Sequence, residues 1–159
     1  MAAGDSHPGG SPFAAARAST ASPESLPWKI ESPDLLDRRK RQRVLFVDDD
    51  AQVVTFASEV LREAGFEVLV GEDGNVALAI VEKEPLDLVI TDLVMRECEG
   101  LETVMRLRKS HPELPVIVIS GAFGGQFLKS AAMLGARATL AKPFSGEELV
   151  SMVQEVLGI

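Results

Sequence analysis

The chain has 159 residues, of which 46% are hydrophobic and 25% are charged, and these values are ordinary for a globular domain. Its formal net charge of −8 argues against direct DNA binding, which needs a basic face. Cys98 is the single cysteine, so an intramolecular disulfide and a CxxC metal site are excluded. No apolar run approaches the roughly 20 residues of a membrane span, and we expect a soluble, cytoplasmic protein with no membrane partner.

Residues 1–42 differ in composition from the rest of the chain. They are rich in Ala, Ser, Pro and Gly, which cannot bury enough apolar surface to offset the entropy of ordering. We predict a disordered tail whose last part, the basic run 38–41, is a solvated lead-in. Residues 43–159 contain 10 basic and 19 acidic side chains, a net charge of −9, and are predicted to form one domain.

From residue 43 onward, short apolar runs alternate with segments at helical spacing. The runs predict five strands, at 44–47, 66–70, 86–90, 116–119 and 138–140. The segments between and after them predict five helices, three of them at 75–82, 101–109 and 125–134. Because these strands lack polar alternation, they suit a parallel sheet covered on both faces, and the sequence predicts a doubly wound α/β fold.

The first and last predicted helices have clear signals. The first is expected to end at Gly65 and to bury one face, made of Val53, Ala57, Val60 and Ala64. The last begins at Ser145, which forms a capping box with Glu148. Asp50 and Asp73 are interpreted as helix caps or turn formers. Three phenylalanines are assigned to the core: Phe46, Phe56 and Phe66.

Polar and charged side chains gather where the predicted strands end. Asp48 and Asp49 follow the first strand, Asp92 the third, Ser120 the fourth and Lys142 the fifth. These ends meet at the edge where open α/β sheets bind ligands. Two carboxylates 4 Å apart repel by roughly 4 kcal/mol at an effective dielectric near 20, so a cation must compensate. Lys142 and a hard divalent ion, Mg²⁺ above all, fit that need, and the set predicts a phosphoryl-transfer site.

Four segments, LFVDDD, LVITDLVM, VIVISGA and LAKPF, resemble in order and spacing the signature blocks of response-regulator receiver domains of two-component signalling. The resemblance covers residues 43–158. It implies a flavodoxin-like (βα)5 fold with strand order 2-1-3-4-5. It also implies a phosphoprotein that receives its phosphoryl group from a sensor histidine kinase or a histidine phosphotransfer protein.

The resemblance also implies a role for each matching residue. Asp92 would be the phosphoacceptor. Mg²⁺ would be bound directly by Asp49, Asp92 and the backbone carbonyl of Val94, and through water by Asp48.

Two further residues of the matching blocks have roles around the phosphoryl group. The hydroxyl of Ser120 would donate to a phosphoryl oxygen, and Lys142 would pair with the acyl phosphate. The bond from Lys142 to Pro143 resembles the cis peptide of the family.

Several positions depart from the family pattern. The usual Met-Pro-x-x-Asp-Gly loop reads MRECEG, so Arg96 replaces the proline while Gly100 is retained. Thr139 stands where many receivers have an aromatic ring that moves on phosphorylation. Val94 and Ala122 are apolar at positions that tune dephosphorylation, and we expect a long-lived phosphoryl state because they cannot orient an attacking water.

Two alternative functions remain open. A phosphatase of the haloacid-dehalogenase type would use Asp48-x-Asp50, but Gln52 stands where that class has threonine. A receiver-like binding scaffold without phosphorylation is the other. Because the chain ends after the fifth predicted helix, we expect a stand-alone response regulator. It would act through an unknown downstream protein and catalyse no reaction beyond its own phosphorylation.

Overall fold

The computed structural model describes residues 41–95, 100–121 and 125–159, and for 125–128 it describes the backbone alone. In this part of the chain, five parallel strands form one sheet in the order β2-β1-β3-β4-β5, as the receiver resemblance implies. The strands are β1 (Arg43–Val47), β2 (Glu67–Gly71), β3 (Leu88–Asp92), β4 (Val116–Ser120) and β5 (Ala138–Ala141). They belong to one compact unit, Arg41–Ile159. The predicted tail, residues 1–42, lies almost wholly outside the described residues.

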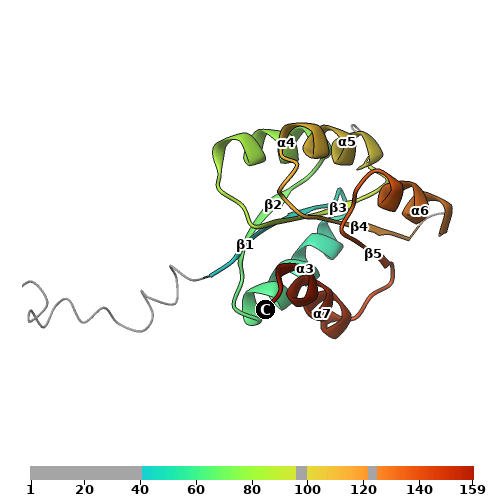
Figure 1. Ribbon diagram of the computed structural model, residues 1–159. Coiled ribbons are helices and arrows are strands. Elements are labelled where there is room, and N and C mark those ends of the chain that lie inside the picture. Colours follow the sequence, from blue (N-terminus) through green and yellow to red (C-terminus); the bar gives the residue numbers. More distant parts are fainter. Residues whose placement is uncertain (1–40, 96–99, 122–124) are drawn as a thin grey trace, which may run out of the picture. The chain divides into compact units, whose positions relative to one another are not determined.

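Helices cover both faces of this sheet (Figure 1). In the described residues, α3 (Ala51–Glu63) and α7 (Gly146–Leu157) lie against one face. The opposite face is covered by α4 (Gly74–Lys83), α5 (Gly100–Ser110) and α6 (Gly125–Met133). The architecture is therefore the predicted doubly wound α/β fold.

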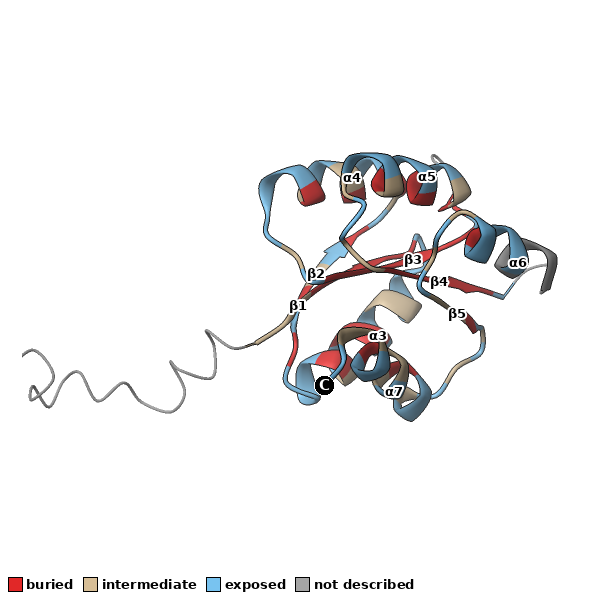
Figure 2. Ribbon diagram, in the orientation of Figure 1, coloured by how far each residue is buried: buried red, intermediate tan, exposed pale blue. Residues whose placement is uncertain are grey.

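The apolar core is divided by the sheet into two layers (Figure 2). Val44 and Phe46 of β1 point into the layer that also contains Leu149 of α7. Leu45 and Val47 point into the opposite layer, toward α4 and α5. Every residue of β3 and β4 is buried, which explains why their sequences show no polar alternation.

Most of the predicted helix ends are confirmed. The Asp50 side chain accepts a hydrogen bond from the Gln52 N–H at 2.9 Å, and Asp73 accepts from Val76 at 2.9 Å. The Ser145 hydroxyl accepts from the Glu148 N–H at 3.1 Å. Gly65 follows α3 with φ 98°, the left-handed conformation that favours glycine at this place.

The third strand lies two residues further along the chain than the predicted range 86–90. Strand β3 begins at Leu88, because Asp87 turns its carboxylate to the Arg43 N–H at 2.7 Å. It continues through Asp92, which pairs in register with Ile119 of β4. The phosphoacceptor candidate, Asp92, is thus the last residue of β3, at the predicted end of the strand.

The predicted buried face of α3 was also partly wrong. The fully buried residues of this helix are Ala57, Ser58 and Leu61, whereas Ala64 is exposed. Phe56 is 43% exposed and does not belong to the core, unlike Phe46 and Phe66. The buried stripe is rotated toward Leu61, which turns the Phe56 ring sideways against Phe144, with ring centroids 6.2 Å apart.

Candidate phosphoryl-acceptor site

The strand ends bring three charged side chains into direct contact. Val47 pairs with Thr91, so the next residues along β1 and β3, Asp48 and Asp92, are neighbours. Lys142, which follows β5, reaches both of them: its Nζ lies 2.7 Å from Asp48 Oδ2 and 3.0 Å from Asp92 Oδ2. Along the chain, Lys142 is 94 residues from Asp48 and 50 residues from Asp92, and the fold brings the three side chains into one cluster.

Backbone N–H groups hold the other oxygen of each carboxylate. The Asp50 N–H donates to Asp48 Oδ1 at 2.9 Å, and the Val94 N–H donates to Asp92 Oδ1 at 3.2 Å. Each carboxylate is therefore bound on one side by the chain that follows it and on the other by Lys142. The side chains of Asp48 and Asp92 are 0% and 9% exposed, so this geometry is fixed in a poorly hydrated place.

A third carboxylate completes an acidic group. Asp48, Asp49 and Asp92 each present an oxygen within 4.8 Å of the others, and Asp49 is exposed. Three carboxylates and the one ammonium of Lys142 leave a formal charge of −2 when all are ionised. An all-oxygen donor set with that charge fits a hard divalent cation such as Mg²⁺.

Burial and pairing shift the pKa values of this cluster. Burial raises the pKa of Asp48 above its ordinary value of 3.8, because lost hydration outweighs the hydrogen bonds from Lys142 and the Asp50 N–H. Burial alone would lower the pKa of Lys142, but its hydrogen bonds to Asp48 and Asp92 raise that pKa above 10.5. The ammonium is thus held charged beside a carboxylate that is costly to ionise without further positive charge.

Ser120 lies beside this cluster. It is the last residue of β4, is 1% exposed, and pairs with Ala141 at the end of β5. Its position at the same edge of the sheet agrees with the predicted location, while its role as a donor to a phosphoryl oxygen stays a prediction.

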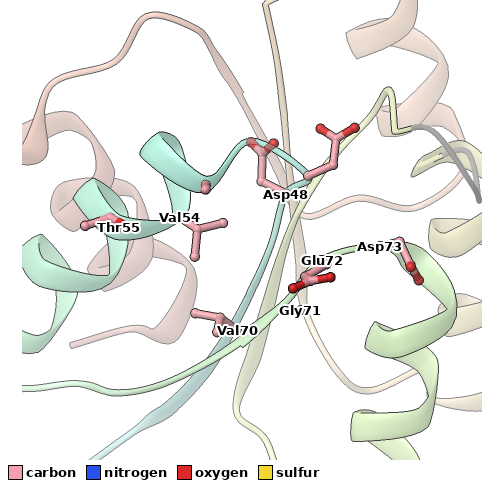
Figure 3. Close-up of a pocket in the computed structure, with 9 residues that line it drawn as sticks. Asp48, Val54, Thr55, Val70, Gly71, Glu72 and Asp73 are labelled. Carbon is pink, nitrogen blue, oxygen red and sulfur yellow. The ribbon is translucent and has the colours of Figure 1, made fainter.

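A cavity of about 490 Å³ opens next to the acidic group. Figure 3 shows Asp48 on one side of it and Glu72 and Asp73, which follow β2, on another. Glu72 was not among the candidate residues, because a single exposed glutamate after a strand has no distinguishing sequence signal. Asp73 caps α4, as predicted.

The structure also places the positions that depart from the family pattern. Thr139 is half-buried on β5 and pairs with Val118. Val94 is 43% exposed beside Asp92, and the Lys142–Pro143 peptide is cis, as the resemblance implied. Arg96, Cys98 and Ala122 lie outside the described residues.

Comparisons with known proteins agree with this geometry. The family model of the response regulator receiver domain matches residues 44–154, and the chain belongs to that family of two-component signalling domains. It is 36% identical over 116 residues to the transcriptional regulatory protein CpxR of Klebsiella pneumoniae, covering 72% of this chain and 49% of CpxR. The chain thus spans about half the length of that relative.

Similarity extends to a eukaryotic protein and to solved structures. The transcription factor SKN7 of Saccharomyces cerevisiae is 36% identical over 115 residues, which are 72% of this chain and 18% of SKN7. The structure of the chemotaxis response regulator CheY4 of Vibrio cholerae superposes with a TM-score of 0.69 at 30% identity, covering 74% of this chain and 99% of CheY4. In the described residues, no helix is long and apolar enough to cross a membrane.

Proposed function

We propose that this domain accepts a phosphoryl group on Asp92 from a histidine kinase or a histidine phosphotransfer protein. The observation that supports this most strongly is the bridge that Lys142 forms between the buried carboxylates of Asp48 and Asp92. A buried acidic pair held by one ammonium costs folding free energy, and such arrangements are typical of functional sites.

The proposed reaction is a displacement at phosphorus. A carboxylate oxygen of Asp92 forms a bond to the phosphorus atom while the bond from phosphorus to the donor imidazole nitrogen breaks, and the electron pair stays on that nitrogen. The Lys142 ammonium would exchange its contact with Asp92 Oδ2 for a contact with an oxygen of the transferred phosphoryl group. The hydroxyl of Ser120 would donate to another phosphoryl oxygen.

The acidic group would hold Mg²⁺ during this reaction. Asp48, Asp49, Asp92 and the backbone carbonyl of Val94 are the groups that would bind it. When bound, the ion neutralises charge on the phosphoryl oxygens. The charge balance of the cluster supports this assignment, because one ammonium does not match three carboxylates.

An apolar surface beside the site supports a protein as the phosphoryl donor. Phe56 and Phe144 flank a cavity of about 520 Å³ that Lys142 also lines. Phe56 is 43% exposed, and aromatic rings of this kind are common anchors of protein interfaces. We expect Phe56→Ser to slow transfer from a donor protein and to leave phosphorylation by a small acyl phosphate unchanged, which separates docking from chemistry.

The output would be a protein–protein contact rather than a contact of this domain with DNA. The net charge of −9 over residues 43–159 supports this, since phosphate backbones bind basic surfaces. We further propose a cytoplasmic domain that catalyses no reaction beyond its own phosphorylation. Asp50 supports the last point, because its side chain caps α3 instead of serving as the second acidic residue of a phosphatase.

A slow return to the unphosphorylated state is part of the proposal. The Val94 side chain stands exposed at the site, where an apolar group cannot orient a water molecule for attack on the acyl phosphate. We expect Val94→Asn to shorten the lifetime of the phosphoryl group. Decay of the wild-type phosphoprotein within seconds in Mg²⁺ would contradict the slow return.

Intact-mass measurement tests the proposed acceptor. Incubation with Mg²⁺ and a small acyl phosphate is expected to add one phosphoryl group to the wild type and none to Asp92→Asn. Asp50→Asn is the matched control, because asparagine still caps a helix. A receiver keeps its adduct in this control, whereas loss of the adduct would favour the phosphatase reaction.

A further inference from the structure

The path of the Lys142 side chain runs across a neighbouring strand. Lys142 follows β5, whereas Asp92 ends β3, and β4 lies between these two strands in the sheet. Adjacent strands are about 4.8 Å apart, so the backbones of β5 and β3 are roughly 10 Å apart. The extended Lys142 side chain, the Asp92 side chain and the 3.0 Å contact between them together bridge this distance when the lysine stem passes over the end of β4.

Gly121 occupies the place where this stem crosses. It follows Ser120 at the end of β4, and the Lys142 N–H donates to the Ser120 carbonyl at 3.0 Å, which holds the two chain segments together. A Cβ added at Gly121 would lie 3.0 Å from Lys142 Cβ, 3.4 Å from Cδ and 3.7 Å from Cγ. All three nearest atoms therefore belong to the stem of one side chain.

Backbone conformation does not explain this glycine. Gly65, Gly135 and Gly158 have positive φ angles, but Gly121 does not, so other residues can adopt its backbone. The space that a side chain at position 121 would need is instead occupied by the Lys142 side chain.

We propose that Gly121 is a positioning residue for Lys142, leaving open the path by which the ammonium reaches both Asp48 and Asp92. The inference rests on the proposed phosphoryl transfer for its functional meaning. Because a Cβ at 3.0 Å forces a shift of a few tenths of an ångström, alanine would disturb the contact slightly. The branched side chain of valine would block the path.

Gly71 offers a matched control. It ends β2 at the same edge of the sheet and has no positive φ angle. A Cβ there would meet Val76 Cγ1 at 3.6 Å and the Ala77 nitrogen at 3.7 Å, which are ordinary contacts. Gly71→Ala thus adds the same methyl group beside the site without touching the lysine.

Acylation of lysine amines by a water-soluble reagent, followed by peptide mass spectrometry, tests the positioning directly. The exposed Lys83, Lys109 and Lys129 of the same sample give the reference rate. In Gly121→Val, we expect the relative acylation of Lys142 to rise about tenfold, as when one hydrogen bond to a charged group is lost. Gly121→Ala should give a smaller rise and Gly71→Ala none.

An unchanged relative rate in both Gly121 variants, with thermal melting showing them folded, would overturn the inference. Should Gly121→Val not fold, Gly121→Ala decides alone. This readout needs no phosphorylation, so a wild type that takes up no phosphoryl group would refute the proposed function and leave the test of Gly121 intact.

A double-mutant cycle on the phosphorylation rate then links position to chemistry. If Gly121 acts through Lys142, Gly121→Val should slow the wild type strongly and Lys142→Met hardly further. Equal slowing in both backgrounds would show that Gly121 acts on something other than the lysine.

Discussion

Two cations bind carboxylates at opposite ends of the strands: Arg43 at the amino ends (the amino edge) and Lys142 at the carboxyl ends (the carboxyl edge). Their side chains are almost equally exposed, at 22% for Arg43 and 21% for Lys142. Their carboxylate partners differ. At the amino edge Arg43 pairs with Glu67 and Glu84, which are 49% and 44% exposed. At the carboxyl edge Lys142 pairs with Asp48 and Asp92, which are 0% and 9% exposed.

This difference in exposure separates a solvated ion pair from the buried one at the proposed phosphoryl-acceptor site. Hydrated carboxylates such as Glu67 and Glu84 cost little to place and contribute little, since solvent screens them. Dehydrated carboxylates such as Asp48 and Asp92 are costly unless a cation and hydrogen bonds compensate. The exposed contact at the amino ends of the strands therefore contributes modestly to stability, whereas the buried contact at the carboxyl ends is the one to which we assign the phosphoryl transfer.

Removing each cation in turn should give the largest contrast. Lys142→Met is expected to slow phosphorylation of Asp92 by about a hundredfold, because it removes a charged donor aimed at the reacting group. Arg43→Met should leave that rate unchanged. The rate of mass gain with a small acyl phosphate measures both. Equal slowing in the two variants would mean that Lys142 has no special part in the phosphorylation of Asp92.

The pH dependence of stability should also differ between the edges. Since the pKa of Asp48 is raised, the folded state binds a proton more readily than the unfolded state. Without divalent ions, stability should fall as pH rises from 3.8 through the raised pKa, by about 1.4 kcal/mol for each pH unit of that window. Urea unfolding in a chelator measures this, and Asp48→Asn should remove this part of the slope.

Lys142 should give a second pH effect in the alkaline range. Its pKa is raised above 10.5, so the stability it contributes is fully present below that value and is lost as pH rises through the folded pKa. Lys142→Met should lack this alkaline loss. A variant that loses stability over the same range as the wild type would show that the lysine does not titrate as described.

Arg43 should matter for folding in a modest way. Besides its ion pairs, its Nη1 donates to the Pro85 carbonyl at 2.8 Å. Arg43→Met is expected to lower the free energy of unfolding by about 1 kcal/mol, the range of half-exposed pairs. Chemical denaturation measures the change. A loss of several kcal/mol would mean that the ion pairs of Arg43 behave like a buried pair rather than like exposed ones.

Salt should produce the smallest effect. At 1 M ionic strength the screening length is about 3 Å, so the stabilisation by exposed pairs should weaken by a few tenths of a kcal/mol. The difference in unfolding free energy between wild type and Arg43→Met should shrink accordingly. The corresponding difference for Lys142→Met should change less, because the carboxylates of Asp48 and Asp92 are buried and buried pairs are screened less by salt.

The sequence predicted the alternation of strands and helices and the convergence of Asp48, Asp92 and Lys142, because both depend on local patterns, whereas the strand order came from the family resemblance. Buried strands are uniform apolar runs, and the residues after them converge at one edge whatever their exact bounds. The sequence did not predict which side chains of α3 face the core. Phe56 fits a helical apolar pattern as well as Leu61 does, and only packing against α7 decides which of them is buried. The crossing of Lys142 over Gly121 depends on strand order and could not be read from Gly121 itself.

Trapping the acyl phosphate tests the central claim most directly. Borohydride reduction of the phosphorylated protein converts a phosphoaspartate to homoserine, and peptide mass spectrometry then locates that residue. We predict homoserine at position 92 in the wild type and no conversion in Asp92→Asn. Homoserine at position 48, or none at any position after exposure to both a small acyl phosphate and a phosphorylated donor protein, would contradict the account.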